Sequence, residues 1–170
     1  MSIPTIETPR LTLRPFTLDD TKALYQILSV LDVLKYFPSS DPPDRERVQK
    51  LIQRQIDHWQ EHGYGWWAVE PHADQQLIGW SGLQYLPDTD EIEIGFLLSK
   101  PYWGKGLATE SAEEGLDFGF STLGLQTIVG IVHPENIASQ RVLEKIGLEF
   151  VKKAEYFGMD CYQYIIKHPR

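Results

Sequence analysis

Pro101-Tyr-Trp-Gly-Lys-Gly-Leu-Ala-Thr-Glu110 is the stretch around which the rest of the chain is organised. It follows an apolar, strand-like run over 91–98 and precedes a helix-like run over 107–120. A strand, a turn and a helix N-terminus together present unpaired backbone N–H groups and the positive end of a helix dipole, which is a seat for phosphate. Gly104 and Gly106 have no Cβ, so a ligand can approach the backbone closely. We therefore expect this turn to bind the pyrophosphate of a nucleotide-like cofactor.

Two familiar phosphate motifs do not match this turn, and alone it is equally compatible with an ordinary strand-to-helix turn. The P-loop needs Ser or Thr after Gly-Lys, whereas Gly106 follows Lys105 here. A dinucleotide fingerprint needs a third small residue where Thr109 stands, and it belongs near the start of its domain. Lys105 adds a cation, but we expect binding to come mainly from backbone N–H groups.

The composition favours one globular domain spanning 1–170, long enough to bury a core. The formal charge of −8 argues against a general nucleic-acid binder, which needs a basic surface. Cys161 is the only cysteine, which excludes an intrachain disulfide and a cysteine-based metal cluster. There is no signal-like N-terminal segment and no apolar run of about 20 residues. We expect a cytoplasmic protein without a membrane or nucleic-acid partner.

Hydrophobic periodicity predicts the element order β-α-α-β-β-β-α-β-α-β-β. A run of adjacent strands followed by a strand-helix-strand crossover indicates an α/β (α+β) fold with a mixed sheet and helices on both faces. The predicted strands are 10–16, 65–70, 76–86, 91–98, 127–132, 149–157 and 159–167, and the helices begin near 17, 44, 107 and 136.

Local signals mark several ends of the predicted helices. Asp44 is a candidate N-cap for the second helix, which ends near Gly63. Asn136 is a good N-cap and Gly147 a good C′ residue for the last helix. The apolar face of the helix over 107–120 leaves its acidic residues mostly to solvent, namely Glu110, Glu113, Glu114 and Asp117.

Residues 136–147, Asn-Ile-Ala-Ser-Gln-Arg-Val-Leu-Glu-Lys-Ile-Gly, form the second informative stretch. Together with residues 102–110 they resemble two motifs of the Gcn5-related N-acetyltransferase (GNAT) superfamily. The opening over 7–15, Glu-Thr-Pro-Arg-Leu-Thr-Leu-Arg-Pro, resembles the first strand of its RimJ/RimL-like branch, which acetylates N-terminal amines of ribosomal proteins. The resemblance covers nearly the whole chain. One position departs from the broad pattern, because Trp103 stands where Gln or Arg is usual.

The resemblance implies a GNAT fold: a mixed, mostly antiparallel, twisted sheet of six to seven strands with about four helices on both faces. It further implies that acetyl-CoA is the co-substrate and lies in a cleft between the two central parallel strands. The turn would then hold the pyrophosphate, the end of the preceding strand would pair with the pantetheine arm, and Asn136 and Ser139 would contact that arm. The implied cofactor-binding residues are Phe96, Leu97, Leu98, Trp103, Gly104, Lys105, Gly106, Leu107, Ala108, Thr109, Asn136 and Ser139.

Acetyl transfer needs a neutral amine and a leaving thiolate that can be protonated. Glu91 and Glu93 share one face of a strand beside the expected acetyl site, and Glu93, nearer the turn, is the preferred base. Ser139, one turn into the last helix, is the best local hydroxyl for the thiolate. Each residue also has a structural interpretation: a solvated strand face for the carboxylates and an N-cap alone for Asn136. His133 more plausibly packs or caps in a loop than acts in catalysis.

The acceptor is expected to be a primary amine, either a protein N-terminus or a small molecule such as an amino acid, polyamine or antibiotic. A non-catalytic CoA-binding module is the alternative from another class. The loop over 36–47 and the last hairpin should decide the acceptor. No cluster has metal-ligand spacing, so no metal is expected, and the chain could be a monomer or a homodimer. Four tryptophans are expected in the core and pocket wall: Trp59, Trp66, Trp67 and Trp80.

Overall fold

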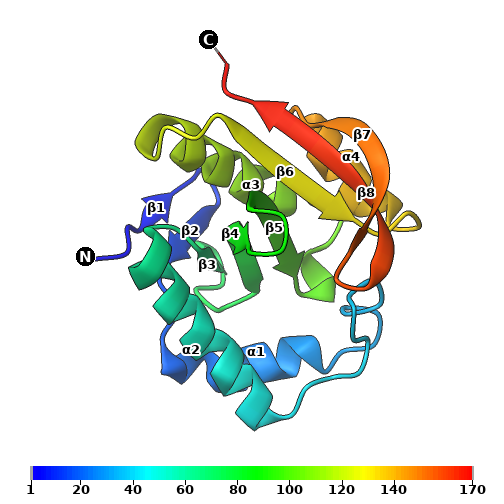
Figure 1. The fold of residues 1–170 in the computed structure, drawn as a ribbon. Helices are drawn as coiled ribbons and strands as arrows, with labels where there is room; N and C mark the ends of the chain where they lie inside the picture. Colours follow the sequence, from blue (N-terminus) through cyan, green and yellow to red (C-terminus); the bar gives the residue numbers. More distant parts are fainter. Residues whose placement is uncertain (1, 170) are drawn as a thin grey trace.

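A computed structural model describes residues 2–169, in which strands and helices alternate much as the sequence predicts (Figure 1). The helices are α1 (Thr21–Leu28), α2 (Arg45–His62), α3 (Leu107–Asp117) and α4 (Ile137–Lys145). Short 3₁₀ segments, Leu18–Asp20 and Lys100–Tyr102, precede α1 and α3, and a π-helical turn, Phe118–Thr122, follows α3. The strands are β1 (Ile6–Glu7), β2 (Leu11–Arg14), β3 (Trp66–Pro71), β4 (Gly79–Leu86), β5 (Glu91–Leu98), β6 (Thr127–Val132), β7 (Glu149–Tyr156) and β8 (Met159–Lys167).

All strands of the described residues belong to one eight-stranded sheet in the order β1-β2-β3-β4-β5-β6-β8-β7. The expected mixed, mostly antiparallel sheet is confirmed, because β5 and β6 are the one parallel pair. The expected count of six to seven strands is one or two below the eight observed. Strand β1 was missed because it has two residues, Ile6 and Glu7, which are too few to show a period.

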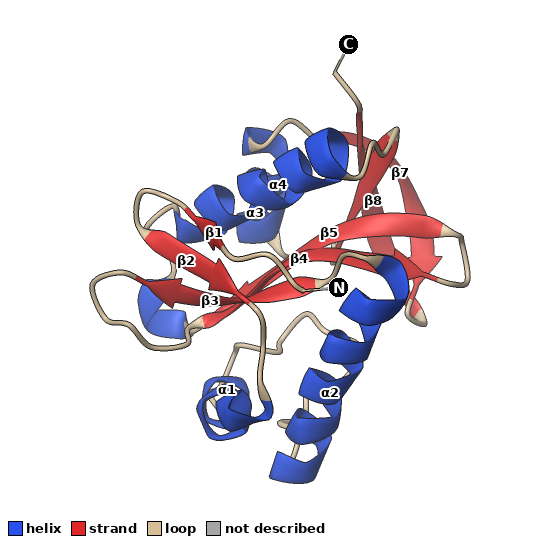
Figure 2. Cartoon of the chain, turned by 90° about the vertical axis from the view of Figure 1, so that its left-hand side faces the viewer, coloured by secondary structure: helices blue, strands red, loops and turns tan. Residues whose placement is uncertain are grey.

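Helices cover both faces of the sheet, as predicted. Figure 2 shows α1 and α2 on one side of the strands and α3 and α4 on the other. The α1–α2 side packs residues such as Leu24 and Ile52 against Trp80 and Leu97. On the other side α3 approaches the sheet closely at Gly115, where an added Cβ would lie 2.7 Å from Ile94 Cδ1.

The predicted helix ends are largely confirmed. The Asp44 carboxylate accepts a hydrogen bond from the Arg47 N–H, and Gly63 ends α2 in the left-handed conformation. Asn136 caps α4, and the helix closes with Gly147 at φ 103°. One expectation about α3 is wrong: Glu110 is only 15% exposed, since it bonds to the turn between β1 and β2.

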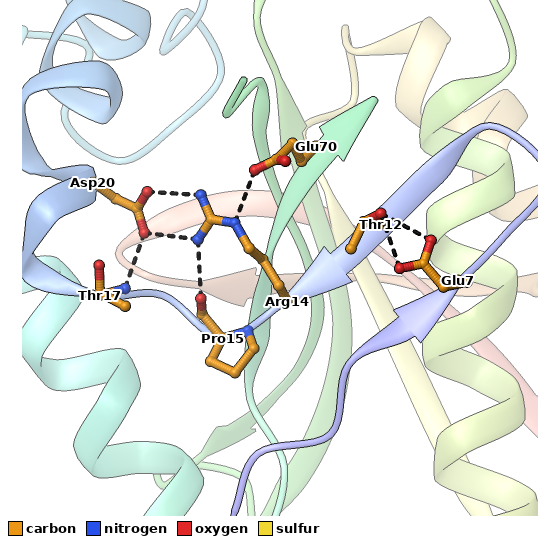
Figure 3. A network of polar contacts seen from close by, with 7 residues as sticks. All are labelled: Glu7, Thr12, Arg14, Pro15, Thr17, Asp20 and Glu70. Atoms are coloured by element: carbon orange, nitrogen blue, oxygen red, sulfur yellow. Dashed lines mark hydrogen bonds and ion pairs between the residues drawn. The ribbon is translucent and has the colours of Figure 1, made fainter. Parts of the chain in front are cut away.

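A polar cluster ties β2 to the start of α1 and to β3 (Figure 3). Arg14 donates to both oxygens of Asp20, at 3.0 and 2.8 Å, and to Glu70 at 2.9 Å. Asp20 in turn accepts from the Thr17 N–H. Because all these groups are partly shielded from water, the cluster fixes the α1–α2 layer against the first strands of the sheet.

Strands β5 and β6 are adjacent only briefly. Their parallel ladder records one residue pair, Glu93 with Val129. Beyond this pair, towards the C-terminal ends of both strands, residues of β5 and β6 line a common cavity instead of pairing with each other. The single parallel contact therefore places an opening at the middle of the sheet, directly before the turn over 101–106.

Candidate active site

The cavity between β5 and β6 has a volume of about 230 Å³. Its walls come from segments that are far apart in the sequence: the loop after α1, strands β3 to β6, the start of α4 and the last hairpin. Sequence-predicted site residues that line it are Glu93, Phe96, His133, Asn136 and Ser139. The structure thus brings both proposed catalytic side chains, Glu93 and Ser139, to one cavity.

Glu93 is a buried carboxyl group, with 8% of the residue exposed. Burial raises the pKa of Glu93 to about 8, and the Glu91 carboxylate adds to this rise, while a backbone hydrogen bond from Ile131 opposes it. A carboxyl group with this pKa exchanges a proton near neutral pH, as a general base must. The solvated strand face that the sequence also allowed for Glu93 is therefore wrong.

Glu91 lies two residues earlier on the same face of β5 but has a different environment. Its carboxylate accepts hydrogen bonds from Tyr156 at 2.6 Å and from Gln163 at 2.9 Å. Gln163 also donates to the Tyr156 oxygen at 2.9 Å, which closes a three-membered network across β5, β7 and β8. Glu91 is thus held in a structural network, and it does not line the cavity.

Asn136 and Ser139 lie in the first turn of α4. The Asn136 side chain accepts from the Ser139 N–H at 3.2 Å, which is the N-cap interaction expected from the sequence. The Ser139 hydroxyl has no hydrogen-bond partner among the described residues, although the residue is partly buried. It therefore remains available to a group inside the cavity.

His133 lies at the mouth of the cavity, and its contacts agree with the structural interpretation. Its Nδ1 accepts a hydrogen bond from the Glu135 N–H at 3.1 Å, and its ring lies 5.1 Å from that of Tyr36. Accepting at Nδ1 selects the neutral tautomer that carries its proton on Nε2. His133 therefore acts first as a loop-ordering residue.

The turn before α3 has the properties that a phosphate seat requires. Gly104 and Gly106 have φ values of 73° and 77°, and an added Cβ at Gly104 would meet nothing within 4 Å. Within the described chain, none of the backbone N–H groups over 104–109 has a hydrogen-bond partner. Trp103 extends away from these groups, since its indole N–H donates to the Leu98 carbonyl at 2.7 Å. The residues present therefore fit a pyrophosphate group.

The strand that leads into this turn keeps one free edge. Phe96, Leu97 and Leu98 pair with β4 on one side, in register with Ser81, Trp80 and Gly79, and have no ladder with β6 on the other. An extended molecule could pair with that edge as a further strand. Their side chains meanwhile pack into the core, with Leu97 and Leu98 each 5% exposed.

The aromatic wall of the cavity was predicted only in part. Trp66 and Trp80 stack with centroids 4.6 Å apart and line it, while Trp59 and Trp67 lie in the core. Sequence reasoning located the loop over 36–47 and the last hairpin but could not choose the residues. Those that face the cavity are Tyr36, Phe37, Pro38, Phe157, Met159 and Cys161.

The described residues contain neither a metal-binding cluster nor a helix able to cross a membrane. No group of three or more His, Cys, Asp or Glu side chains lies close enough together to hold a metal ion. None of the helices combines the length and the apolar character that crossing a membrane requires.

Comparison with known proteins gives the family. The sequence model of the protein family described as acetyltransferase (GNAT) domain matches residues 10–149. The uncharacterized N-acetyltransferase YoaA of Bacillus subtilis is 32% identical over 147 residues, which cover 86% of this chain and 83% of that protein. The crystal structure of an acetyltransferase from Agrobacterium tumefaciens superposes with a TM-score of 0.84 at 29% identity, covering 98% and 95% of the two chains.

The structure of RimL, ribosomal L7/L12 alpha-N-protein acetyltransferase, in complex with coenzyme A superposes with a TM-score of 0.80 over 96% of this chain and 98% of that one. Its 20% identity establishes a shared fold. The chain belongs to the GNAT acetyltransferase family, and its class is N-acetyltransferase.

Proposed function

We propose that this protein transfers the acetyl group of acetyl-CoA directly to a primary amine, with Glu93 as the general base. The observation that carries the proposal is the position of Glu93, a buried carboxyl group with a raised pKa in the cavity where β5 and β6 separate. Acetyl-CoA supplies an activated thioester, and the protein supplies orientation and proton transfer.

The cofactor-binding role of the turn is supported by its free N–H groups. The backbone over 104–109 would hold the pyrophosphate, assisted by the dipole of α3, whereas the Trp103 N–H already donates to the Lys100 carbonyl at 3.1 Å. The free edge of Phe96, Leu97 and Leu98 would hold the pantetheine arm, and one of its N–H groups would face the thioester oxygen. Asn136, whose oxygen is engaged as an N-cap, would contact the same arm through its NH₂ group.

Two side chains would take part in proton transfer, one at the amine and one at the leaving thiolate. Glu93 would accept a proton from the amine, directly or through a water, when the carboxyl group is ionised. Ser139 would donate a hydrogen bond to the departing thiolate, a weak base with a reference pKa of about 8.5, and would relay a proton from solvent to it, so that the hydroxyl is restored. The free state of the Ser139 hydroxyl supports this assignment.

The lining of the cavity favours an acceptor with one amine and an apolar neighbouring group. Glu93 is the one carboxylate among the described lining residues, and aromatic rings surround it. A second ammonium group, as in a polyamine, would lie there without a counter-ion. A protein N-terminus of the RimJ/RimL type meets these conditions, and a small apolar amine is the second candidate.

A coupled thiol-release assay tests the proposal. The panel contains a peptide with a free apolar N-terminus, the same peptide with a blocked N-terminus, phenethylamine, an amino acid and spermidine. We expect turnover with the free peptide or the apolar amine and none with the blocked peptide. Binding of acetyl-CoA in calorimetry without turnover of any amine would instead support a non-catalytic CoA-binding module.

A further inference from the structure

Arg10, in the turn between β1 and β2, contacts the phosphate-binding turn from a distance of 95 residues in the sequence. Its Nη1 donates to the Lys105 carbonyl at 2.8 Å, and its Nε donates to Glu110 at 2.7 Å. Its Nη2 lies beside Gly106, 3.4 Å from the position of an added Cβ. The guanidinium group therefore spans the turn and the first helical turn of α3.

The bond to the Lys105 carbonyl sets the direction of an N–H group. In a trans peptide unit the carbonyl and the next N–H point in opposite directions. Because Arg10 holds the Lys105 carbonyl on its own side, the Gly106 N–H points away from Arg10, out of the turn. Rotation of this peptide unit changes ψ of Lys105 and φ of Gly106, and glycine tolerates either sign of φ, so the unit is easy to rotate unless something fixes it.

Arg10 also binds the carboxylate of Glu110. This carboxylate lies in the first turn of α3, where a bound pyrophosphate would be repelled by an unbalanced negative charge. It is neutralised by Arg10, whose Nε and backbone N–H both donate to it, and by the Thr8 hydroxyl at 2.6 Å. The β1–β2 turn therefore neutralises a carboxylate beside the proposed pyrophosphate site. It also orders the backbone of the turn over 101–106.

We propose that Arg10 is a positioning residue for the cofactor: it fixes the Lys105–Gly106 peptide unit in the orientation that binds the pyrophosphate and neutralises Glu110 beside it. This inference rests on the proposed use of acetyl-CoA. Arg10 acts through Lys105 and Glu110, so its effect falls on the affinity for acetyl-CoA and not on the rate at saturation.

Arg10→Ala tests the inference in two measurements, calorimetric binding of acetyl-CoA in the absence of an acceptor and steady-state kinetics with one. We expect the dissociation constant and the KM for acetyl-CoA to rise about tenfold, with kcat within about twofold of the wild type. Arg10→Lys should give an intermediate KM, because one ammonium group cannot reach both partners at their present distances.

Arg14→Ala is the matched control. Arg14 lies on the adjacent strand with a comparable set of partners, Asp20 and Glu70, and has no contact with the turn (Figure 3). Arg14→Ala should lower the denaturation midpoint and leave the KM for acetyl-CoA unchanged. Wild-type affinity in Arg10→Ala, or a loss of kcat at constant KM, would overturn the inference alone. Absence of acetyl-CoA binding in the wild type would overturn the proposed function and, with it, this inference.

Discussion

The Tyr156 hydroxyl donates a hydrogen bond to the Glu91 carboxylate at 2.6 Å, and this contact distinguishes the two acidic residues of β5. Burial raises the pKa of Tyr156 to about 12, and the hydrogen bond to Glu91 adds to the rise. Glu93, two residues further along, has no such donor side chain. One carboxyl group of β5 is therefore bound in a side-chain network, while the other lies buried in the cavity with its pKa raised to about 8.

Glu91→Gln should lower the pKa of Glu93. Burial, the larger cause of the raised pKa, is unchanged, but the nearby negative charge is removed. The rising limb of the pH–kcat/KM profile should then move to lower pH. A profile that stays in place would show that the charge of Glu91 does not reach Glu93. Tyr156→Phe, which keeps the Glu91 carboxyl group, is the matched control for loss of the network and should cost about 1 kcal/mol of stability.

Glu93→Gln should remove the base while preserving the shape of the side chain. We expect kcat/KM to fall about 100-fold at pH 8. In the wild type, activity should rise with pH through a pKa of about 8, because the carboxyl group must be ionised to accept a proton. In the variant the remaining pH dependence should follow the ionisation of the acceptor amine alone, which changes when the acceptor is changed. An unaltered rate would reassign the base to water.

Ser139→Ala should separate catalysis from stability at the start of α4. The hydroxyl is unpartnered, so its loss should change the free energy of unfolding by less than about 0.5 kcal/mol. If the hydroxyl protonates the thiolate, kcat should fall about tenfold with unchanged affinity for acetyl-CoA. Asn136→Ala should instead cost about 1 kcal/mol through the lost N-cap, and Asn136→Asp should restore it. Denaturation curves and single-turnover rates measure both effects.

The sequence predicts the parts of this fold that depend on local signals. Strands β5 and β6 begin and end where their apolar runs do, and Asp44, Asn136 and Gly147 mark helix ends through their own chemistry. The site depends on contacts without a local signal. Nothing in the pattern around Arg10 or Glu110 indicates that they meet, and Glu110 looked like a solvated residue on the polar face of a helix.

The same limit applies to the cavity. Glu93 could be selected because β-strand alternation places it near the turn, but its burial depends on the last hairpin, which brings Phe157 and Met159 to the cavity. Tyr36 and Phe37 lie in an irregular loop, where no periodicity assigns a direction to a side chain. Pattern therefore predicts which strand carries the base, and only tertiary structure gives the environment that sets its pKa.

His58 makes the stability of the α2–β4 contact depend on pH. Its Nδ1–H donates to the Tyr64 carbonyl at 2.8 Å, and its Nε2 accepts from the Tyr85 N–H at 3.1 Å, so the folded ring is neutral. Burial lowers the pKa of His58 below 6.5, with the nearby His62 adding to the decrease. The unfolded state then binds more protons, and the contribution of His58 is complete above pH 6.5 and is lost as the pH falls through the folded value.

Glu93 affects the pH dependence of stability in the opposite direction. Because its pKa is raised in the folded state, the unfolded state binds fewer protons. The contribution of Glu93 to the free energy of unfolding is therefore lost as the pH rises from 4.5 to about 8. The His58 effect should therefore be measured in a Glu93→Gln background. There, the urea midpoint should be lower at pH 5.5 than at pH 7.5, because the folded ring resists protonation. In Glu93→Gln/His58→Gln that slope should disappear. A slope that persists would assign the titration to another histidine.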